Sequence, residues 1–184
     1  MDITQQYLNI RMIRENLDNI PDFGLPAGYS IRWFQPGDEK SWHTIHLLAD
    51  QYTVVTPDLF EKEFGNKIRI LAERQCFLLD RKDSPIGTAS AWFDDCSKQS
   101  SGRIHWVAVI PTEQGKGLAK PLLTMVCKRL KALGHQRAHL TTQTVRISAI
   151  NLYLTFGFAP AIDSERDREI WQLLQKHLKY SIDV

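Results

Sequence analysis

The sequence contains few cysteines and no run of basic residues. Its 184 residues include three cysteines, Cys76, Cys96 and Cys127, an odd number without metal-ligand spacing. We therefore expect reduced thiols, no metal site and no disulfide framework. The formal net charge is only +2 and no five consecutive residues are basic, which argues against a nucleic-acid partner.

The sequence also lacks a segment that would direct it to a membrane. Residues 1–6 contain no basic region followed by an apolar stretch. The longest uninterrupted apolar run in the second half, residues 106–110, is far too short to cross a bilayer. We expect a cytoplasmic protein without a membrane partner. Apolar residues make up 43% and charged residues 24%, which is ordinary for one globular domain.

The most informative segment is residues 109–119, where an apolar strand is followed by a short turn and an amphipathic helix. The first N–H groups of a helix lack intrahelical partners and carry partial positive charge, so such a turn binds anions. Gly115 and Gly117 let the backbone approach a pyrophosphate, and Lys116 and Lys120 add charge. The segment therefore predicts a phosphorylated ligand.

Two common nucleotide motifs do not match this turn. A Walker loop requires a glycine four residues before the Gly-Lys pair, where this chain has Ile110. A Rossmann fingerprint requires a third spaced glycine and an early position in the chain, and both are missing here.

The turn instead resembles the acyl-CoA loop of the GNAT superfamily of N-acetyltransferases. The family pattern Gln/Arg-x-x-Gly-x-Gly/Ala is matched by Gln114, Gly117 and Ala119, after a matching Val-x-Pro at residues 109–111. The second family signature, Ala-x-x-Leu-Tyr followed by Gly-Phe, is matched at residues 149–158. The resemblance is specific over residues 103–158 and weaker over residues 28–100. Residues 1–27 lie outside it, so we expect an N-terminal extension (1–27) and an acetyltransferase domain (28–184).

The resemblance implies a GNAT-like α/β fold (α+β): a mixed, mostly antiparallel central sheet flanked by helices. Periodicity and turn residues predict helices and strands in a compatible order. Strands are expected at residues 29–33, 76–79, 86–92, 103–109 and 138–141, and helices near 42–49, 57–64, 118–133 and 149–156. A last pair of strands is expected to end with one around residues 170–174. Residues 1–27 fit a helix or a strand, and Pro121 is expected to loosen the start of its helix.

The resemblance also implies acetyl-CoA as cosubstrate, with no metal. In the family the strand before the turn splays from its parallel neighbour, which frees main-chain N–H groups near Val109 for the acetyl carbonyl and the pantetheine arm. Many members have an asparagine where this chain has Arg146, and either Asn151 or Arg146 could substitute for it. The expected cofactor-binding residues are Val107, Val109, Gln114, Gly115, Lys116, Gly117, Leu118, Ala119, Lys120 and Asn151.

Two residues are candidates for catalysis. Tyr153 matches a family tyrosine that can donate a proton to the leaving thiolate, with a packed core tyrosine as the alternative. His105 lies where several members place a general-base glutamate, and strand alternation puts it on one face with Val107 and Val109. A structural histidine or a group that binds the substrate is equally compatible with the sequence.

Other residues carry weaker signals. Asp94 and Asp95 could attract a cationic acceptor, but paired acids in a polar loop are usually only solvated. Aromatic residues could line an acceptor pocket, although their strand and helix spacing favours the core. These aromatic residues are Trp33, Trp42, Tyr52, Trp92 and Trp106.

The function expected from these observations is direct transfer of an acetyl group from acetyl-CoA to a primary amine of a small molecule, peptide or protein. The alternative is a non-catalytic acyl-CoA sensor or interaction module. The expected partners are acetyl-CoA and the amine acceptor. The identity of the acceptor and the formation of a homodimer are left open.

Overall fold

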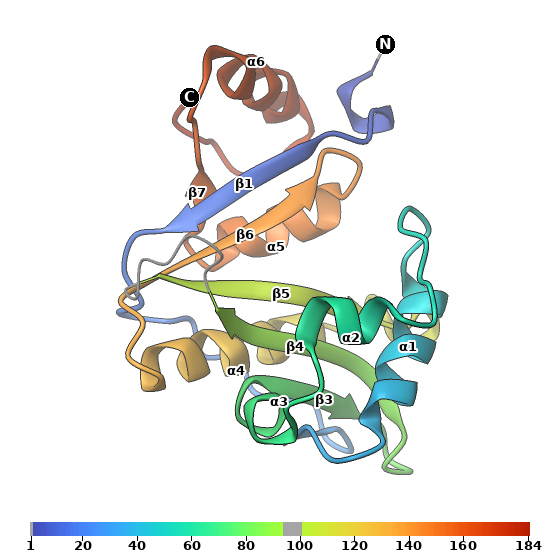
Figure 1. Cartoon of the computed structure of the whole chain (residues 1–184). Coiled ribbons are helices and arrows are strands. Elements are labelled where there is room, and N and C mark those ends of the chain that lie inside the picture. Colours follow the sequence, from blue (N-terminus) through green and yellow to red (C-terminus); the bar gives the residue numbers. More distant parts are fainter. Residues whose placement is uncertain (1, 94–100) are drawn as a thin grey trace.

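The computed structural model of the chain describes residues 2–93 and 101–184, and these residues form one mixed sheet with helices on both faces (Figure 1). The strand order is β2-β3-β4-β5-β6-β1-β7. The strands are β1 (Asn9–Arg14), β2 (Ser30–Trp33), β3 (Gln75–Leu79), β4 (Pro85–Phe93), β5 (Ser101–Val109), β6 (Arg137–Gln143) and β7 (Ala159–Pro160). The α-helices are α1 (Asp38–Ala49), α2 (Leu59–Phe64), α3 (Ile68–Arg74), α4 (Ala119–Ala132), α5 (Ile147–Thr155) and α6 (Glu165–Leu174). Short 3₁₀ turns are η1 (Ile3–Gln5), η2 (Pro111–Glu113) and η3 (Gln175–His177).

The sheet is antiparallel except for the pair β5 and β6. A right-handed crossover through α4 is the standard way to connect two parallel neighbours. The fold class and the parallel pairing expected from the sequence are therefore confirmed.

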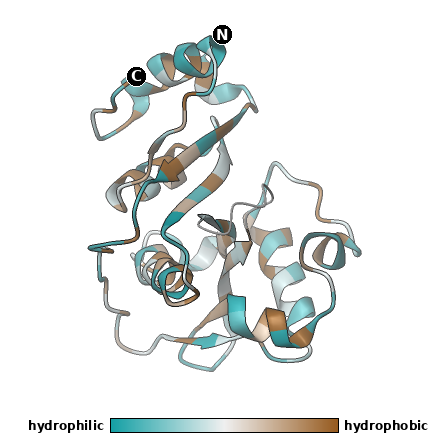
Figure 2. Cartoon of the chain, turned by 60° about the vertical axis from the view of Figure 1, so that its left-hand side comes forward, coloured by the Kyte–Doolittle hydropathy of each residue, from teal (hydrophilic) through white to brown (hydrophobic). Residues whose placement is uncertain are grey.

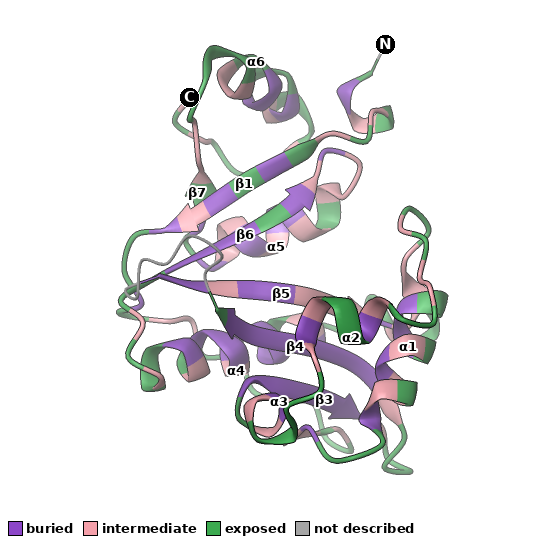
Figure 3. Cartoon of the chain, viewed as in Figure 1, coloured by how far each residue is buried: buried purple, intermediate pink, exposed green. Residues whose placement is uncertain are grey.

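Alternating side chains of the central strands bury two separate apolar clusters. Leu78 points to a cluster formed with α4, α5 and α6, whereas its neighbour Phe77 points to a second cluster formed with α1, α2 and α3. Because both faces are covered, β3 and β4 are buried over almost their whole length (Figure 3). This double covering fixes the register of the strands that lead to the site.

Residues 1–27 contribute a strand to the sheet. β1 pairs antiparallel with β6 from Asn9↔Gln143 to Arg14↔Ala138, and it also pairs with β7. The alternation of exposed and buried residues along β1 selects the strand over the helix that the sequence also allowed. The segment that precedes the family resemblance is thus part of the same sheet in the described structure.

The prediction of a final strand at residues 170–174 is wrong. These residues belong to helix α6, whose N-cap Ser164 accepts a hydrogen bond from the backbone N–H of Asp167. Ile170, Trp171 and Leu174 are buried at helical spacing, and the helix near the chain ends combines hydrophobic and hydrophilic residues (Figure 2). Helix α3 was not anticipated either, because its apolar residues are interrupted by charged ones.

Pro121 lies close to the start of its helix. Helix α4 begins at Ala119, so Pro121 is the third helical residue and lies in the first turn. An N–H at this position has no intrahelical acceptor, and proline therefore costs the helix little. At the other end Gly134 has φ +87°, as expected for a glycine that ends a helix.

Across the described ranges, none of the helices is long and apolar enough to cross a membrane. The same residues contain no group of three or more His, Cys, Asp and Glu side chains arranged to hold a metal ion.

Candidate functional site

A cavity lies where β5 and β6 separate. Their parallel pairing covers only Ser101↔Arg137 to Arg103↔His139, after which the two strands diverge (Figure 1). A cavity of about 450 Å³ lies in the gap, lined by β5, β6, the end of α1 and the start of α5. This volume is within the range of small-molecule sites. The splayed strand edge expected from the resemblance is therefore present.

The glycine turn follows the open edge of β5 directly. Gly115 has φ +77° and Gly117 has φ +78°, a conformation that other residues adopt at a cost. A Cβ added to either glycine would meet nothing within 4 Å, so the turn faces open space. Gln114 donates a hydrogen bond from Nε2 to the carbonyl oxygen of Val109 at 2.8 Å, which ties the turn to the strand.

The remaining predicted cofactor residues occupy different environments. Lys116 pairs with Glu113 at 2.9 Å, and the Lys120 ammonium lies 4.9 Å from the ring centroid of Phe23. Leu118 is buried in the core, whereas Val107 and Val109 line the cavity.

Arg146 and Asn151 were the two residues expected to replace the asparagine of the family. The structure places their side chains in different environments. Asn151 donates from Nδ2 to the Ile147 carbonyl at 2.9 Å and accepts from the Lys179 N–H at 2.7 Å. Both polar atoms of its side chain are thus used within the fold. Arg146, by contrast, lines the cavity.

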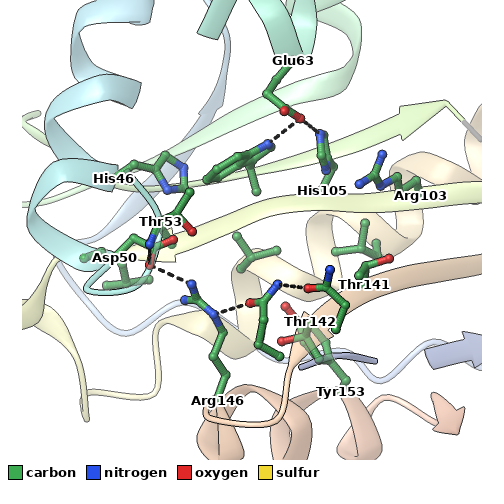
Figure 4. Close-up of a pocket in the computed structure, with 18 of the residues that line it drawn as sticks. His46, Asp50, Thr53, Glu63, Arg103, His105, Thr141, Thr142, Arg146 and Tyr153 are labelled. Atoms are coloured by element: carbon green, nitrogen blue, oxygen red, sulfur yellow. Dashed lines mark hydrogen bonds and ion pairs between the residues drawn. The ribbon is translucent and has the colours of Figure 1, made fainter. Parts of the chain in front are cut away.

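Tyr153 reaches the cavity from α5 (Figure 4). Its side chain is buried, and this burial raises the pKa of its phenol to about 12. The phenol is therefore protonated throughout the physiological range.

His105 lies on the opposite face of β5 from Val107 and Val109, so the prediction that they share a face is wrong. Trp106 has a left-handed φ of +49°, and the register between β4 and β5 shifts between Thr88 and Ser90. Such a bulge places two successive side chains on one side of the strand. His105 and Trp106 therefore both face the helices α1 and α2.

Glu63 of α2 connects these two neighbouring side chains. Its Oε2 atom lies 2.9 Å from His105 Nε2 and 2.9 Å from Trp106 Nε1 (Figure 4). The hydrogen bond with His105, helped by that from Trp106, lowers the pKa of the half-buried Glu63 carboxyl to about 2. The cavity thus contains an ionised carboxylate bound to an imidazole.

A second polar network crosses the cavity near α5. Arg146 donates from Nη2 to Asp50 Oδ1 at 2.7 Å and from Nε to Gln143 Oε1 at 2.6 Å, and Gln143 in turn donates to Asn9 at 3.1 Å (Figure 4). The Arg146 guanidinium also lies 5.2 Å from the ring centroid of Tyr52. Although burial opposes ionisation of Asp50, hydrogen bonds from Tyr52, Arg146 and Thr53 lower its pKa.

His46 forms part of the wall between these networks. Its ring is almost fully buried between Trp42 and Trp106, and burial lowers its pKa to about 3. Its Nε2 atom has no hydrogen-bond partner among the described residues. His46 is therefore a neutral imidazole beside the cavity.

The other sequence candidates divide into core, surface and undescribed residues. Trp42 and Trp92 are buried, as favoured from their spacing, whereas Trp106 lines the cavity and Tyr52 is exposed. Asp94, Asp95 and Cys96 lie outside the described residues.

Several residues that line the cavity were not predicted from the sequence. Glu63 carried a detectable signal, because it lies between Phe60 and Phe64 on the apolar side of a short helix, where a charge needs a partner. Asp50 and His46 carried no comparable signal, since their role depends on contacts with distant segments. The polar residues missed are Tyr7, Asn9, His46, Asp50, Thr53, Glu63, Arg103, Thr141, Thr142 and Gln143.

Comparison with known sequences places this site in a wider context. The sequence model of the acetyltransferase (GNAT) family matches residues 41–158. The mycothiol acetyltransferase of Paenarthrobacter aurescens is 30% identical over 149 residues, which cover 76% of this chain and 45% of that protein. The mycothiol acetyltransferase of Streptomyces coelicolor is 24% identical over 156 residues, covering 83% of this chain and 50% of that protein. The chain spans about half the length of the curated relatives it matches.

Solved structures share the fold. A GCN5-related N-acetyltransferase from Sphaerobacter thermophilus superposes with a TM-score of 0.67 at 23% identity, covering 84% of this chain and 50% of that chain. The ribosomal-protein-S18-alanine N-acetyltransferase from Escherichia coli superposes with a TM-score of 0.60 at 19% identity, covering 73% of this chain and 79% of that chain.

Proposed function

This chain belongs to the acetyltransferase (GNAT) family, and we propose that it transfers an acetyl group from acetyl-CoA directly to a primary amine. One observation carries the proposal: β5 and β6 diverge beside the cavity, and the glycine turn follows at the end of β5. This arrangement joins a free strand edge to an anion-binding turn, which suits a long ligand with phosphates at one end.

The residues present fit acetyl-CoA. The turn at residues 115–120 would hold the diphosphate through main-chain N–H groups, because Gly115 and Gly117 face open space and α4 begins immediately afterwards. The free edge of β5 at Val107 and Val109 would hold the pantetheine arm and the acetyl carbonyl. When bound, acetyl-CoA supplies the thioester that is cleaved.

Tyr153 is the proposed proton donor. A thiol leaving group departs more easily when a positioned acid protonates it. Tyr153 lines the cavity and its phenol keeps its proton at neutral pH, because burial raises its pKa to about 12. Its O–H would therefore donate to the thiolate sulfur as the C–S bond breaks.

His105 is the proposed general base for the acceptor. The nucleophile must be a neutral amine, so an ammonium ion has to lose a proton first. His105 is a cavity residue whose imidazole is held by the ionised carboxylate of Glu63. It would take the proton directly or through one water molecule.

The acceptor is proposed only as an amine. The curated relatives are named mycothiol acetyltransferases, and their names agree with acetyl transfer. The cavity is also lined by hydroxyl and amide side chains and by the Asp50–Arg146 pair. These groups suit a polar acceptor rather than an apolar one.

A test is the release of free CoA thiol from acetyl-CoA with a panel of small polar amines and peptides with free N-termini. Acceptor-dependent release supports the proposal. A thermal-shift titration with acetyl-CoA and with ATP is run beside it. Stabilisation by acetyl-CoA without thiol release for any acceptor would favour the alternative, a non-catalytic sensor, and absence of stabilisation by acetyl-CoA would contradict both functions.

A further inference from the structure

The N-terminal segment contributes two side chains to the cavity. Tyr7 lies just before β1 and Asn9 is the first residue of this strand, and both line the cavity. The family model matches residues 41–158, so both residues precede the matched region. What they do in the cavity therefore has to be argued from their own contacts.

Backbone contacts hold this segment against β6. The Leu8 carbonyl accepts a hydrogen bond from the N–H of Thr144 at 3.0 Å, and the Leu8 N–H donates to Thr144 Oγ1 at 3.2 Å. The next residue, Asn9, pairs with Gln143 in the ladder between β1 and β6. Tyr7 and Asn9 are thus held on either side of a fixed residue, beside the end of β6.

Asn9 lies on the face of the sheet that is opposite to α4. Ile10 and Met12 of β1 are buried in the apolar cluster that contains the core residues of α4. Because successive residues of a strand point to opposite faces, Asn9 points to the side of α1 and α2. The proposed acetyl-CoA turn leads into α4, whereas the proposed base His105 faces α1 and α2. Asn9 therefore shares its face with the base rather than with the turn.

Asn9 and Tyr7 keep polar groups that the fold does not use. Asn9 is exposed, its Oδ1 accepts from Gln143 Nε2 at 3.1 Å, and its Nδ2 makes no hydrogen bond with the described residues. The Tyr7 hydroxyl lies 3.5 Å from Thr53 Oγ1, which is long for a bond between hydroxyls, and its ring centroid lies 5.9 Å from that of Tyr52. The amide N–H groups of Asn9 and the Tyr7 hydroxyl can therefore donate to a ligand in the cavity.

The charges closest to Asn9 in this network neutralise each other. Gln143, the partner of Asn9, also accepts from Arg146 Nε at 2.6 Å, and Arg146 pairs with Asp50 at 2.7 Å (Figure 4). A charged group of a ligand would lose hydration here without meeting an uncompensated opposite charge from this pair. An uncharged polar group loses less hydration and can still accept hydrogen bonds.

We propose that Tyr7 and Asn9 bind the non-reacting end of the amine acceptor, and that this end is an uncharged oxygen-bearing group such as an amide or a hydroxyl. This inference rests on the proposed function. Asn9 Nδ2 donates to the oxygen of that group, and the Tyr7 hydroxyl makes a second hydrogen bond with it. The two residues set the specificity for the acceptor and take no part in the chemical step.

The test compares amines of similar length that differ at the far end. β-Alaninamide ends in an amide, β-alanine in a carboxylate, 1,3-diaminopropane in an ammonium and butylamine in a methyl group. Release of CoA thiol from acetyl-CoA gives kcat/KM for each amine. β-Alaninamide should exceed the other three about tenfold, because its end is uncharged and can accept a hydrogen bond from Asn9.

Variants of the two residues locate the binding site. N9A loses one hydrogen bond, so the KM for β-alaninamide should rise about 3- to 10-fold while kcat and the KM for acetyl-CoA stay unchanged. Y7F should raise the same KM. R11A is the matched control, because Arg11 is exposed on the same face of β1 but pairs with Asp163 at 2.9 Å and does not line the cavity. R11A should keep the wild-type KM.

Two results would overturn the inference. One is a preference for the carboxylate, ammonium or methyl end, and the other is an unchanged KM in N9A for whichever amine is acetylated. An NMR titration of the CoA-bound protein with β-alaninamide needs no turnover and should shift the side-chain amide signals of Asn9. If the wild type acetylates no amine, the proposed function fails, while unmoved Asn9 signals would contradict this inference separately.

Discussion

Arg146 and Asp50 form an ion pair of 2.7 Å that connects the start of α5 to the end of α1 across the cavity. The two residues are 96 positions apart in the sequence. Asp50 is the C-cap of α1 and also accepts hydrogen bonds from the N–H groups of Tyr52 and Thr53. The pair therefore fixes the position of the loop after α1 relative to the loop before α5, and with it the width of one side of the cavity.

Loss of Arg146 should destabilise the protein. The Asp50 side chain is only 8% exposed, and R146A leaves its carboxylate without the cation that faces it. We expect a decrease of about 2 kcal/mol in the free energy of unfolding, measured in urea at pH 7.

A double-mutant cycle isolates this pair. D50N combined with R146A should cost less than the sum of the two single variants. R168A is the control, because Arg168 pairs with Glu165 at 3.5 Å on the surface and should change stability by less than about 0.5 kcal/mol. Additive effects of D50N and R146A would show that the pair is not coupled.

G117A should weaken acetyl-CoA binding. A residue other than glycine pays about 1–2 kcal/mol for the left-handed conformation, and Gly117 has φ +78°. We expect the free turn of G117A to relax away from this conformation and to regain it on binding, so the Kd for acetyl-CoA should rise about 5- to 30-fold by calorimetric titration. G24A is the matched control, since Gly24 lacks a positive φ and has no atom within 4 Å of an added Cβ. Equal Kd values for G117A and the wild type would argue against binding at this turn.

Y153F should lose turnover while keeping cosubstrate affinity. Removal of a general acid typically costs about 100-fold or more in kcat, and the ring of Tyr153 would keep its packing against Phe158. Because the pKa of Tyr153 is raised to about 12, the wild type should show no decline in kcat from this residue between pH 7 and pH 10.

Y180F removes an exposed phenol and should leave the rate unchanged. If Y153F turned over at the wild-type rate, Tyr153 would be a packing residue only.

His46 should make the folded protein less stable in mild acid. In the unfolded chain a histidine binds a proton near pH 6.5, but burial lowers the pKa of folded His46 to about 3. The unfolded state therefore binds the extra proton, and stability falls as the pH drops below 6.5. Between pH 7 and pH 5 this amounts to about 2 kcal/mol.

The H46L variant should lack this share of the pH dependence. The free energy of unfolding in urea is measured at pH 7 and at pH 5. H177Q, which removes an exposed imidazole instead, serves as the matched control. The same loss of stability in H46L as in the wild type would refute the assignment to His46.

Much of the fold was predictable because its signals are local. The strand, turn and helix around residues 109–119 follow from apolar periodicity and two glycines, and β3, β4 and α1 follow from short-range patterns. The failure at residues 170–174 has a local explanation too. Ile170, Trp171 and Leu174 fit a helix, and the Ser164 cap that begins α6 is itself a local signal for a helix start.

The site was less predictable, because its polar contacts join distant segments. Glu63 and His105 are 42 positions apart, and no pattern in the sequence relates them. The side of β5 occupied by His105 depends on the backbone at Trp106, where a residue other than glycine adopts φ +49°. Strand alternation assumes regular backbone geometry, so it could not anticipate this reversal.

The glycine turn at residues 115–117, the tyrosine of α5 and the order of the central elements follow from the sequence, since each depends on residues close together in the chain. The contact between His105 and Glu63, the Arg146–Asp50 connection across the cavity and the place of β1 within the sheet depend on the tertiary structure. The physical reason is that backbone preference and periodicity act over a few residues, whereas the pairing of charges and strand edges depends on which segments the folded core brings together.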